Sequence, residues 1–522
     1  MDAISLSIFA NRIDSICSEM GATLQKAAFS PNIRDRLDYS CAIFDADGEL
    51  CAQAAHIPVH LGSMAFAMSD VVSTIQWSDG DMVVLNDPYK GGTHLPDVTL
   101  IAPLYVSGKL SGFVANRAHH ADIGSETPGS MPLSSSLFEE GLIIEPSFLV
   151  KAGVVDEDYF TDLMKHMRNR QESSGDFIAQ VAANRRGLTR LAALIEKMGL
   201  QNYLLSLDLL NDYAEKLAKD SLCEIKDGEY SFEDVLDDDG QGQRDIEIKA
   251  SITFKAGSII VDFAGSAGQV SGNINCPLSV TAAAVYYVFR CLMPPQTPAC
   301  AGSFRNIHID APRHSVVNAS YPAAVAAGNV ETSTRIVDVV LGALAQAIPG
   351  RIPAASHGSM NNLAMGNTGD RDYAAWDYYE TIGGGMGASS ISDGLDAVQT
   401  HMTNTLNTPI ESLEMKYPLR VNRYQVRTQS SGHGDFKGGE GLIREYTFLS
   451  PAHVTILSER RLQQPWGVSI SNGLASPDRE ETSASPGENL LNGRLLGAKL
   501  SFEVSSGDIV CISTAGGGGY NT

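Results

Sequence analysis

The stretch DYSCAIFDADGELCAQA, from Asp38 to Ala54, places two alternating apolar runs on either side of Asp47-Gly48. An Asp-Gly pair between such runs is a strong short-range signal for a β-hairpin, because glycine adopts the positive φ that a tight turn needs. Upstream, residues 2–28 carry apolar side chains at helical spacing. We therefore expect the chain to begin with an amphipathic helix followed by a hairpin.

Beyond the hairpin the periodicity predicts further elements. A helix is expected at 63–75, and strands at 82–85, 98–104 and 110–115. Three helices with short breaks follow between 156 and about 224, a period-two region covers 228–264, and helices are expected at 279–292 and 335–348. After about Pro349 the sequence becomes rich in Gly, Ser and Thr, which indicates short strands and many turns.

These patterns predict an α+β, multi-subdomain chain rather than one simple core, because 522 residues exceed the usual size of a single domain. We expect a mixed α/β region at 1–150 that carries the candidate metal site, and a helical segment at 151–225. A middle α+β region at 226–348 and a mostly β, glycine-rich region at 349–522 follow.

The composition narrows the function classes. A net charge of −23 argues against a nucleic-acid surface, which needs basic side chains to neutralise phosphates. There is no apolar run of 18 residues and no signal-peptide pattern at the N-terminus, so we expect a cytoplasmic protein without a membrane partner. The eight cysteines include no CxxC pair, which favours buried reduced thiols over a disulfide framework.

Three His and three Asp fall within two short stretches, NDPYKGGTHLPDVTL (86–100) and NRAHHADIG (116–124). Pro96 predicts a loop around His94 and Asp97, and a loop can turn both side chains inward. His119 is expected to end a strand, with His120 pointing away and Asp122 placed to orient an imidazole. A metal site and ordinary polar strand ends both remain open from this spacing.

Other residues compete for the same roles. Asp38, His56, His60 and Asp87 are further candidates, and His60 and Asp87 could each be structural, since Asp-Pro is a common turn. The glycine runs at 383–387 and 515–520 have no Walker lysine and no GxGxxG strand–turn–helix context. We interpret these runs as turns or close backbone contacts; a phosphate or carbonyl cradle stays open for the first.

Several stretches resemble the B subunit of the hydantoinase/oxoprolinase family, which includes N-methylhydantoinase and caprolactamase and is related to acetone carboxylase. They are RDRLDYSCAIFDADGELCAQAAHIPVHLGSM, NDPYKGGTHLPDVTLIAPL, GFVANRAHHADIGSETPGSMP and FEEGLIIEP. The resemblance continues through NRRGL, DFAGSAGQVSGNINCP and HGSMNNL to GGGGY near the end, and so covers almost the whole chain.

The resemblance implies an ATP-dependent hydrolase of cyclic amides built from two kinds of subunit, as an α2β2 heterotetramer. The partner, a hydantoinase A-type ATPase subunit, binds ATP and Mg and phosphorylates the ring carbonyl. The B subunit, which this chain resembles, holds a divalent metal, zinc or manganese, and completes ring opening by water attack. The absence of a Walker motif fits ATP chemistry on another chain.

Carried over to this sequence, the resemblance implies metal ligands at His94, Asp97 and His119, with Asp38 as the fourth. It leaves His120 and Asp122 to orient a ligand or relay a proton. The substrate could be hydantoin, N-methylhydantoin, 5-oxoproline or a larger lactam. Two alternatives remain: a subunit of a carboxylase similar to acetone carboxylase, and a non-catalytic partner that stabilises the ATPase subunit.

Overall fold

The predicted hairpin forms one edge of an antiparallel sheet in the computed structural model, which describes residues 2–55, 57–60, 62–369, 373–471, 474–478 and 480–522. Gly48 has φ +86°, as the Asp-Gly turn requires. The sheet has the strand order β2-β1-β5-β4-β3-β6-β7. Its strands are β1 (Tyr39–Phe44), β2 (Leu50–Ala55), β3 (Met82–Leu85), β4 (Asp97–Val106), β5 (Lys109–His119), β6 (Ser147–Lys151) and β7 (Val154–Val155).

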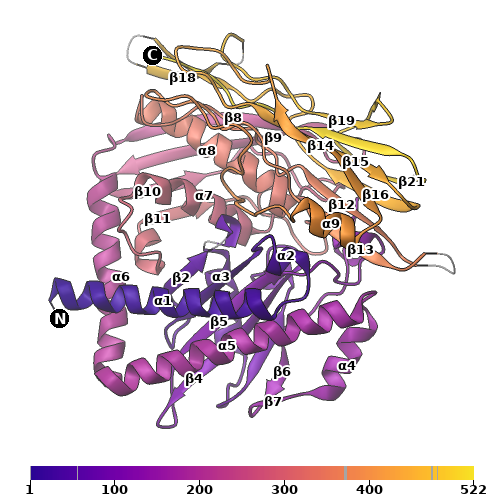
Figure 1. The fold of residues 1–522 in the computed structure, drawn as a ribbon. Coiled ribbons are helices and arrows are strands. Elements are labelled where there is room, and N and C mark those ends of the chain that lie inside the picture. Colours follow the sequence, from indigo (N-terminus) through magenta and orange to yellow (C-terminus); the bar gives the residue numbers. More distant parts are fainter. Residues whose placement is uncertain (1, 56, 61, 370–372, 472–473, 479) are drawn as a thin grey trace.

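Helices cover both faces of this sheet. The long helices α1 (Ala3–Ala27) and α5 (Arg170–Met198) pack against one another and against β1, β4 and β5 (Figure 1). The short helix α3 (Ser63–Thr74) lies on the other face, where Met64, Met68 and Val71 join a separate apolar cluster with Phe44 and Val83. Helices α2 (Pro31–Arg34), α4 (Glu157–Lys165) and α6 (Leu200–Leu222) complete this part. The sheet is therefore buried on both sides, which holds its strand ends in place.

The three helices predicted between 156 and 224 are confirmed as α4, α5 and α6. Helix α5 packs on β4 and β5, so its apolar side chains share a core with the first 150 residues. The fourfold division of the chain stays a prediction.

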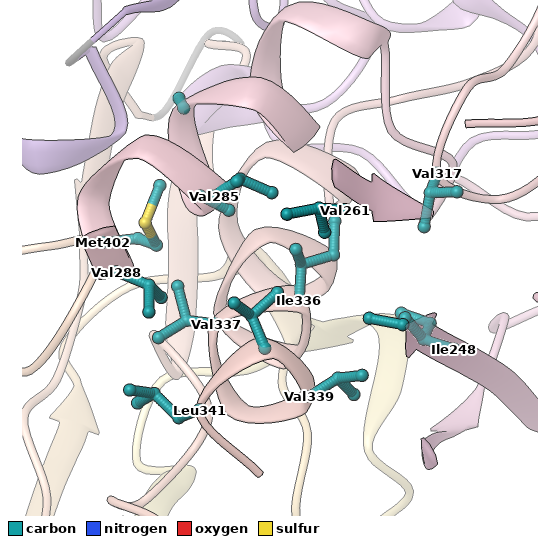
Figure 2. Packing of buried hydrophobic residues seen from close by; sticks show 14 of the residues in the cluster. Ile248, Val261, Val285, Val288, Val317, Ile336, Val337, Val339, Leu341 and Met402 are labelled. Atoms are coloured by element: carbon teal, nitrogen blue, oxygen red, sulfur yellow. The ribbon is translucent and has the colours of Figure 1, made fainter. Parts of the chain in front are cut away.

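The middle of the chain contains the largest apolar core. Helices α7 (Leu278–Leu292) and α8 (Ser333–Ala347) pack against a four-stranded sheet of order β11-β10-β9-β8. These strands are β8 (Gly228–Asp238), β9 (Arg244–Lys255), β10 (Ser258–Asp262) and β11 (Ile307–Asp310). Figure 2 shows Ile336 and Val337 of α8 beside Val285 and Val288 of α7 and Val261 of β10. Every labelled side chain there is apolar, so this core supports the fold and carries no chemistry.

The C-terminal region is mostly β, as predicted, with one short helix, α9 (Ile410–Lys416), in its described part. It has three sheets, of orders β13-β12-β16-β21, β14-β15-β22-β19-β20 and β18-β17-β23. The strands are β12 (Asn362–Asn367), β13 (Trp376–Glu380), β14 (Leu419–Arg427), β15 (Gly441–Phe448), β16 (Ala452–Leu457), β17 (Gly467–Ser471), β18 (Leu474–Asp478), β19 (Glu488–Leu491), β20 (Arg494–Leu495), β21 (Lys499–Val504), β22 (Ile509–Ser513) and β23 (Tyr520–Asn521). The fold class, mixed α and β without a barrel, is confirmed.

The two glycine runs pack against each other. The Gly385 N–H donates to the Ala515 carbonyl over 3.1 Å, and the Ala388 N–H donates to the Gly518 carbonyl over 2.9 Å. A Cβ on Gly517 would lie only 2.0 Å from the Met386 carbonyl oxygen. The interpretation of these runs as close backbone contacts is confirmed. All eight cysteines are unpaired, and among the described residues no helix is both long and apolar enough to cross a bilayer.

Candidate metal centre

The pairing of β4 with β5 brings the two predicted stretches together. Asp97 is the first residue of β4, His119 is the last residue of β5, and the antiparallel register places them opposite each other. His94 lies in the loop before β4, as Pro96 led us to expect, and its carbonyl accepts a hydrogen bond from the Asp97 N–H over 3.1 Å. The loop thus turns the His94 side chain toward the end of the strand pair.

These three residues form the one group in the described part of the chain whose ligand atoms lie within 4.8 Å of one another. Asp97 Oδ1 is 3.3 Å from His94 Nε2 and 3.2 Å from His119 Nδ1. All three are buried, with 1%, 1% and 2% of their surfaces exposed for His94, Asp97 and His119. Ligand atoms about 2.0–2.2 Å from one ion lie roughly 3–3.5 Å apart at tetrahedral or octahedral angles. The observed spacing therefore fits a divalent ion.

The hydrogen bonds of His94 define which of its nitrogens is free. Its Nδ1 lies 3.2 Å from the carbonyl oxygen of Ala326, which can only accept, so Nδ1 carries the proton. The lone pair is then on Nε2, which has no hydrogen-bond partner and faces Asp97. The Ala326 N–H in turn donates to Glu140 Oε1 over 2.9 Å. Such an outer contact fixes the ring and its tautomer in protein metal sites.

The second oxygen of Asp97 is held from three directions. Thr93 Oγ1 donates to Oδ2 over 2.5 Å, Asn329 Nδ2 lies 3.4 Å away, and His60 Nε2 also lies 3.4 Å away. His60 Nδ1 is 2.9 Å from Ser40 Oγ. The sequence named His60 only as a competitor that could be structural, and no periodicity connects it with Asp97. His56, the other candidate in that segment, lies outside the described residues.

The electrostatics of the triad favour a bound cation. Burial raises the pKa of Asp97, but the charge on His94 and the hydrogen bonds from His119, His60 and His94 outweigh it, and the pKa falls well below its usual value. Burial lowers the pKa of His94, yet the Asp97 carboxylate outweighs it and the net direction is upward. Asp97 therefore stays ionised and attracts positive charge at the position between the two imidazoles.

A small cavity adjoins the triad. Its volume is about 20 Å³, which is room for one ion or one water and less than a five-membered ring occupies. Side chains from all parts of the chain line it; they are Asp38, Ile57, Val59, His60, His94, Asp97, His119, Asn329, Val330, Met360, Tyr379, Thr381, Thr403 and Thr405. The Tyr379 ring stacks on His119, with centroids 4.8 Å apart and planes 13° apart. The walls must separate before a ring can reach the triad.

The remaining predicted residues have other contacts. Asp38 lines the cavity, and its carbonyl accepts from the His119 N–H over 3.0 Å, but its carboxylate is not part of the 4.8 Å group. His120 points away from the triad, with Nε2 3.0 Å from Gln180 Oε1 and its ring on Phe177. Burial lowers the pKa of His120.

Asp122 orients a turn rather than an imidazole. Its carboxylate accepts hydrogen bonds from the N–H groups of Gly124, Arg168 and Asn169, just before α5 begins. Asp87 accepts from the Tyr89 N–H over 2.9 Å, which is the turn chemistry expected of Asp-Pro. The catalytic roles of His120 and Asp122 stay predictions; in this structure both residues support the backbone around the strand end.

Comparison with protein families identifies relatives along the whole chain. A family model described as Hydantoinase B/oxoprolinase matches residues 2–522. 5-oxoprolinase 1 of Arabidopsis thaliana is 38% identical over 563 residues, which cover 100% of this chain and 42% of that protein. The B subunit of a putative D-/L-hydantoinase from a Pseudomonas species is 32% identical over 489 residues, covering 90% of this chain and 81% of that protein. The chain thus spans less than half of the 5-oxoprolinase and most of the hydantoinase subunit.

Solved structures agree with the sequence comparison. The ATP-dependent caprolactamase from Pseudomonas jessenii superposes with a TM-score of 0.91 at 27% identity, covering 100% of this chain and 91% of that chain. A nucleotide-free acetone carboxylase structure gives a TM-score of 0.84 at 16% identity, over 98% of this chain and 75% of that chain. The second likeness concerns the fold alone.

Proposed function

The chain belongs to the hydantoinase B/oxoprolinase family, and we propose that it is the metal-bearing subunit of an ATP-dependent hydrolase of cyclic amides. The observation that carries this proposal is the buried His94–Asp97–His119 triad, whose unpartnered imidazole nitrogens face one carboxylate. A partner A-type ATPase subunit would phosphorylate the ring carbonyl, and this chain would complete the ring opening. One relative is named as the B subunit of a hydantoinase, which supports an assembly of two kinds of subunit.

The residues would divide the work as follows. His94 Nε2, Asp97 Oδ1 and a ring nitrogen of His119 would hold the ion, with Asp38 as the fourth ligand from the same cavity. A zinc or manganese ion supplies a Lewis acid there and lowers the pKa of water toward neutrality. Thr93, Asn329 and His60 keep the Asp97 carboxylate in one orientation.

The cavity walls would protect the reacting carbonyl. An amide carbonyl is a poor electrophile, and its phosphorylated form is readily lost to stray water, so the site must be dry. The side chains of Val59, Val330 and Met360 provide apolar surface beside the triad. His120 and Asp122 would act at a distance, by fixing the end of β5 and the turn before α5.

Metal analysis of purified variants tests the proposal. We expect about one zinc or manganese ion per wild-type chain, and at least a tenfold lower content in His94→Ala and Asp97→Ala, because each loses a ligand. Asp122→Asn is the matched control, since Asp122 is equally buried but lies outside the triad, and it should keep its metal. A full metal load in both alanine variants would refute the ligand assignment.

Turnover then separates the proposed role from its alternatives. The chain is mixed with an A-type ATPase subunit and ATP, and hydantoin, 5-oxoproline and caprolactam are offered in turn. We expect ring opening of one of them, which the alanine variants lose. Full ring opening by metal-free variants would instead make this chain a non-catalytic partner, and bicarbonate-dependent turnover of a ketone would indicate a carboxylase.

A further inference from the structure

A buried arginine lies behind the metal cavity without a carboxylate partner. Arg36 is 0% exposed, and its guanidinium donates to the Tyr379 carbonyl over 2.8 Å, to Thr381 Oγ1 over 3.0 Å and to Thr405 Oγ1 over 3.4 Å, with Asn32 Oδ1 also at 3.4 Å. All four acceptors are uncharged. Among the described residues, no carboxylate oxygen lies within 4.0 Å of this guanidinium. A buried charge without a counter-ion is costly, so its field must act on something else nearby.

The hydrogen bonds from Arg36 have a fixed direction. Arginine only donates, so Thr381 Oγ1 accepts from Arg36, and it also accepts from Gln399 Nε2 over 3.3 Å. A hydroxyl has two acceptor lone pairs and one proton, so the Thr381 proton is left for Thr405 Oγ1, which is 2.7 Å away. Thr405 thus accepts from Thr381, and no described residue accepts its own proton. The chain of hydrogen bonds ends in a free O–H donor.

That donor faces the metal cavity, because Thr381 and Thr405 both line it together with the triad. A second buried arginine shows that this ending is unusual. Arg117 is also 0% exposed and donates to Ser63 Oγ, but Ser63 donates onward to the Val59 carbonyl over 3.1 Å. The hydrogen bonds from Arg117 end within the protein, whereas those from Arg36 end at the cavity.

We propose that the Thr405 hydroxyl, polarised by Arg36 through Thr381, is a binding group for an anionic oxygen of the substrate. The inference rests on the proposed function, and it specifies the substrate class as one that carries negative charge next to the reacting carbonyl. The charge could come from a carboxylate on the ring, as in 5-oxoproline, or from the phosphoryl group of the activated carbonyl. The space beside the triad has the size of one water, so the contact is with a single oxygen.

Calorimetric titration of the zinc-loaded full chain tests this subsite. The probes are inorganic phosphate, 5-oxoproline, and 2-pyrrolidinone, which is the same ring without the carboxylate. Thr405→Val keeps the shape of the side chain and removes its donor, so we expect roughly ten- to hundredfold weaker binding of an anionic probe and unchanged binding of 2-pyrrolidinone. Thr405→Ser should restore the affinity, and Thr403→Val, from the same cavity, should have no effect.

The outcomes separate the two sources of charge. A loss for 5-oxoproline alone assigns the subsite to a ring carboxylate, a loss for phosphate alone assigns it to the phosphoryl group, and a loss for both assigns it to either anion. Equal affinities in wild type and Thr405→Val, or an equal loss in Thr403→Val, overturn the inference. If the wild-type chain takes up no zinc, the proposed function fails, and phosphate titration of the metal-free chain still decides the subsite.

Discussion

Two buried polar clusters in this chain are balanced in different ways. The metal centre surrounds the Asp97 carboxylate with imidazoles, a hydroxyl and an amide, none of which is permanently charged. The other cluster, which we call the ionic network, joins three cations to three carboxylates, all with side chains 0% exposed. Its members are Arg335, Arg460, Lys499, Asp234, Asp338 and Glu459. The network is neutral by itself, whereas the metal centre needs a cation.

Two buried histidines show the same difference. The Asp97 carboxylate outweighs burial at His94 and raises its pKa. His357 lies next to the ionic network, where burial and the positive charges on His401 and Arg461 lower its pKa to about 3. A carboxyl-rich region is therefore no metal site if arginine and lysine already neutralise it, and the unpartnered carboxylate is the better sign.

The largest expected effect comes from breaking the ionic network. Arg460 Nη2 donates to Asp234 over 2.8 Å and to Asp338 over 2.6 Å. Arg460→Met leaves these buried carboxylates short of positive charge, so we expect a loss of about 3–5 kcal/mol in the free energy of unfolding, measured with urea. The metal content should not change, because the network and the triad share no residue.

The control for this prediction is an exposed pair. Arg423 binds Glu445 at the surface, and Arg423→Met should cost no more than about 1 kcal/mol. Equal losses in the two variants would contradict the importance of burial. A loss of metal in Arg460→Met would show that the two clusters are one unit.

Much of the fold could be predicted because its signals are local. The Asp47-Gly48 turn, the period-two strands and the 3.6-period helices depend on residues close in sequence, and each formed near its predicted position. The loop at Pro96 and the strand end at His119 also followed from local chemistry. Local signals do not give strand register, so the pairing of Asp97 with His119 came from the resemblance and was confirmed by the structure.

The rest of the site could not be predicted from local patterns. Asn329, Tyr379 and Thr405 line the cavity from more than 200 residues beyond the triad, so tertiary packing alone brings them there. His60 comes from a single 3-10 turn, Pro58–His60, whose position depends on the hydrogen bond from the Val59 N–H to the Met402 carbonyl. A three-residue turn has no periodicity that a sequence can reveal.

The second prediction concerns His60 and sharpens the comparison from the side of the metal. His60 Nε2 contacts Asp97 Oδ2, the oxygen that does not face the other two imidazoles. Contacts of this kind orient a ligand, and their loss typically weakens metal binding by 10–100-fold. We therefore expect roughly that loss of zinc affinity in His60→Gln, measured by competition with a chromogenic chelator.

Ser40→Ala provides the graded control, because Ser40 contacts only the far nitrogen of His60 and should cause a smaller loss. Wild-type affinity in His60→Gln would make His60 a structural residue, as the sequence allowed. A complete loss of metal, equal to that of Asp97→Ala, would instead make His60 a ligand.

The smallest expected effect is a pH dependence at His357. Its pKa is about 3 in the folded chain against 6.5 in the unfolded chain, so the unfolded chain takes up a proton first as the pH falls. Stability from this group is complete above pH 6.5 and decreases toward pH 3, by about 1.4 kcal/mol per pH unit in that window. In His357→Gln the free energy of unfolding should fall less steeply between about pH 6 and pH 4, in urea titrations of metal-free protein. The sign is opposite for His94, whose raised pKa adds stability that is lost as the pH rises. Identical slopes in wild type and His357→Gln would mean that His357 is charged in the folded chain, and the contrast between the two histidines would then fail.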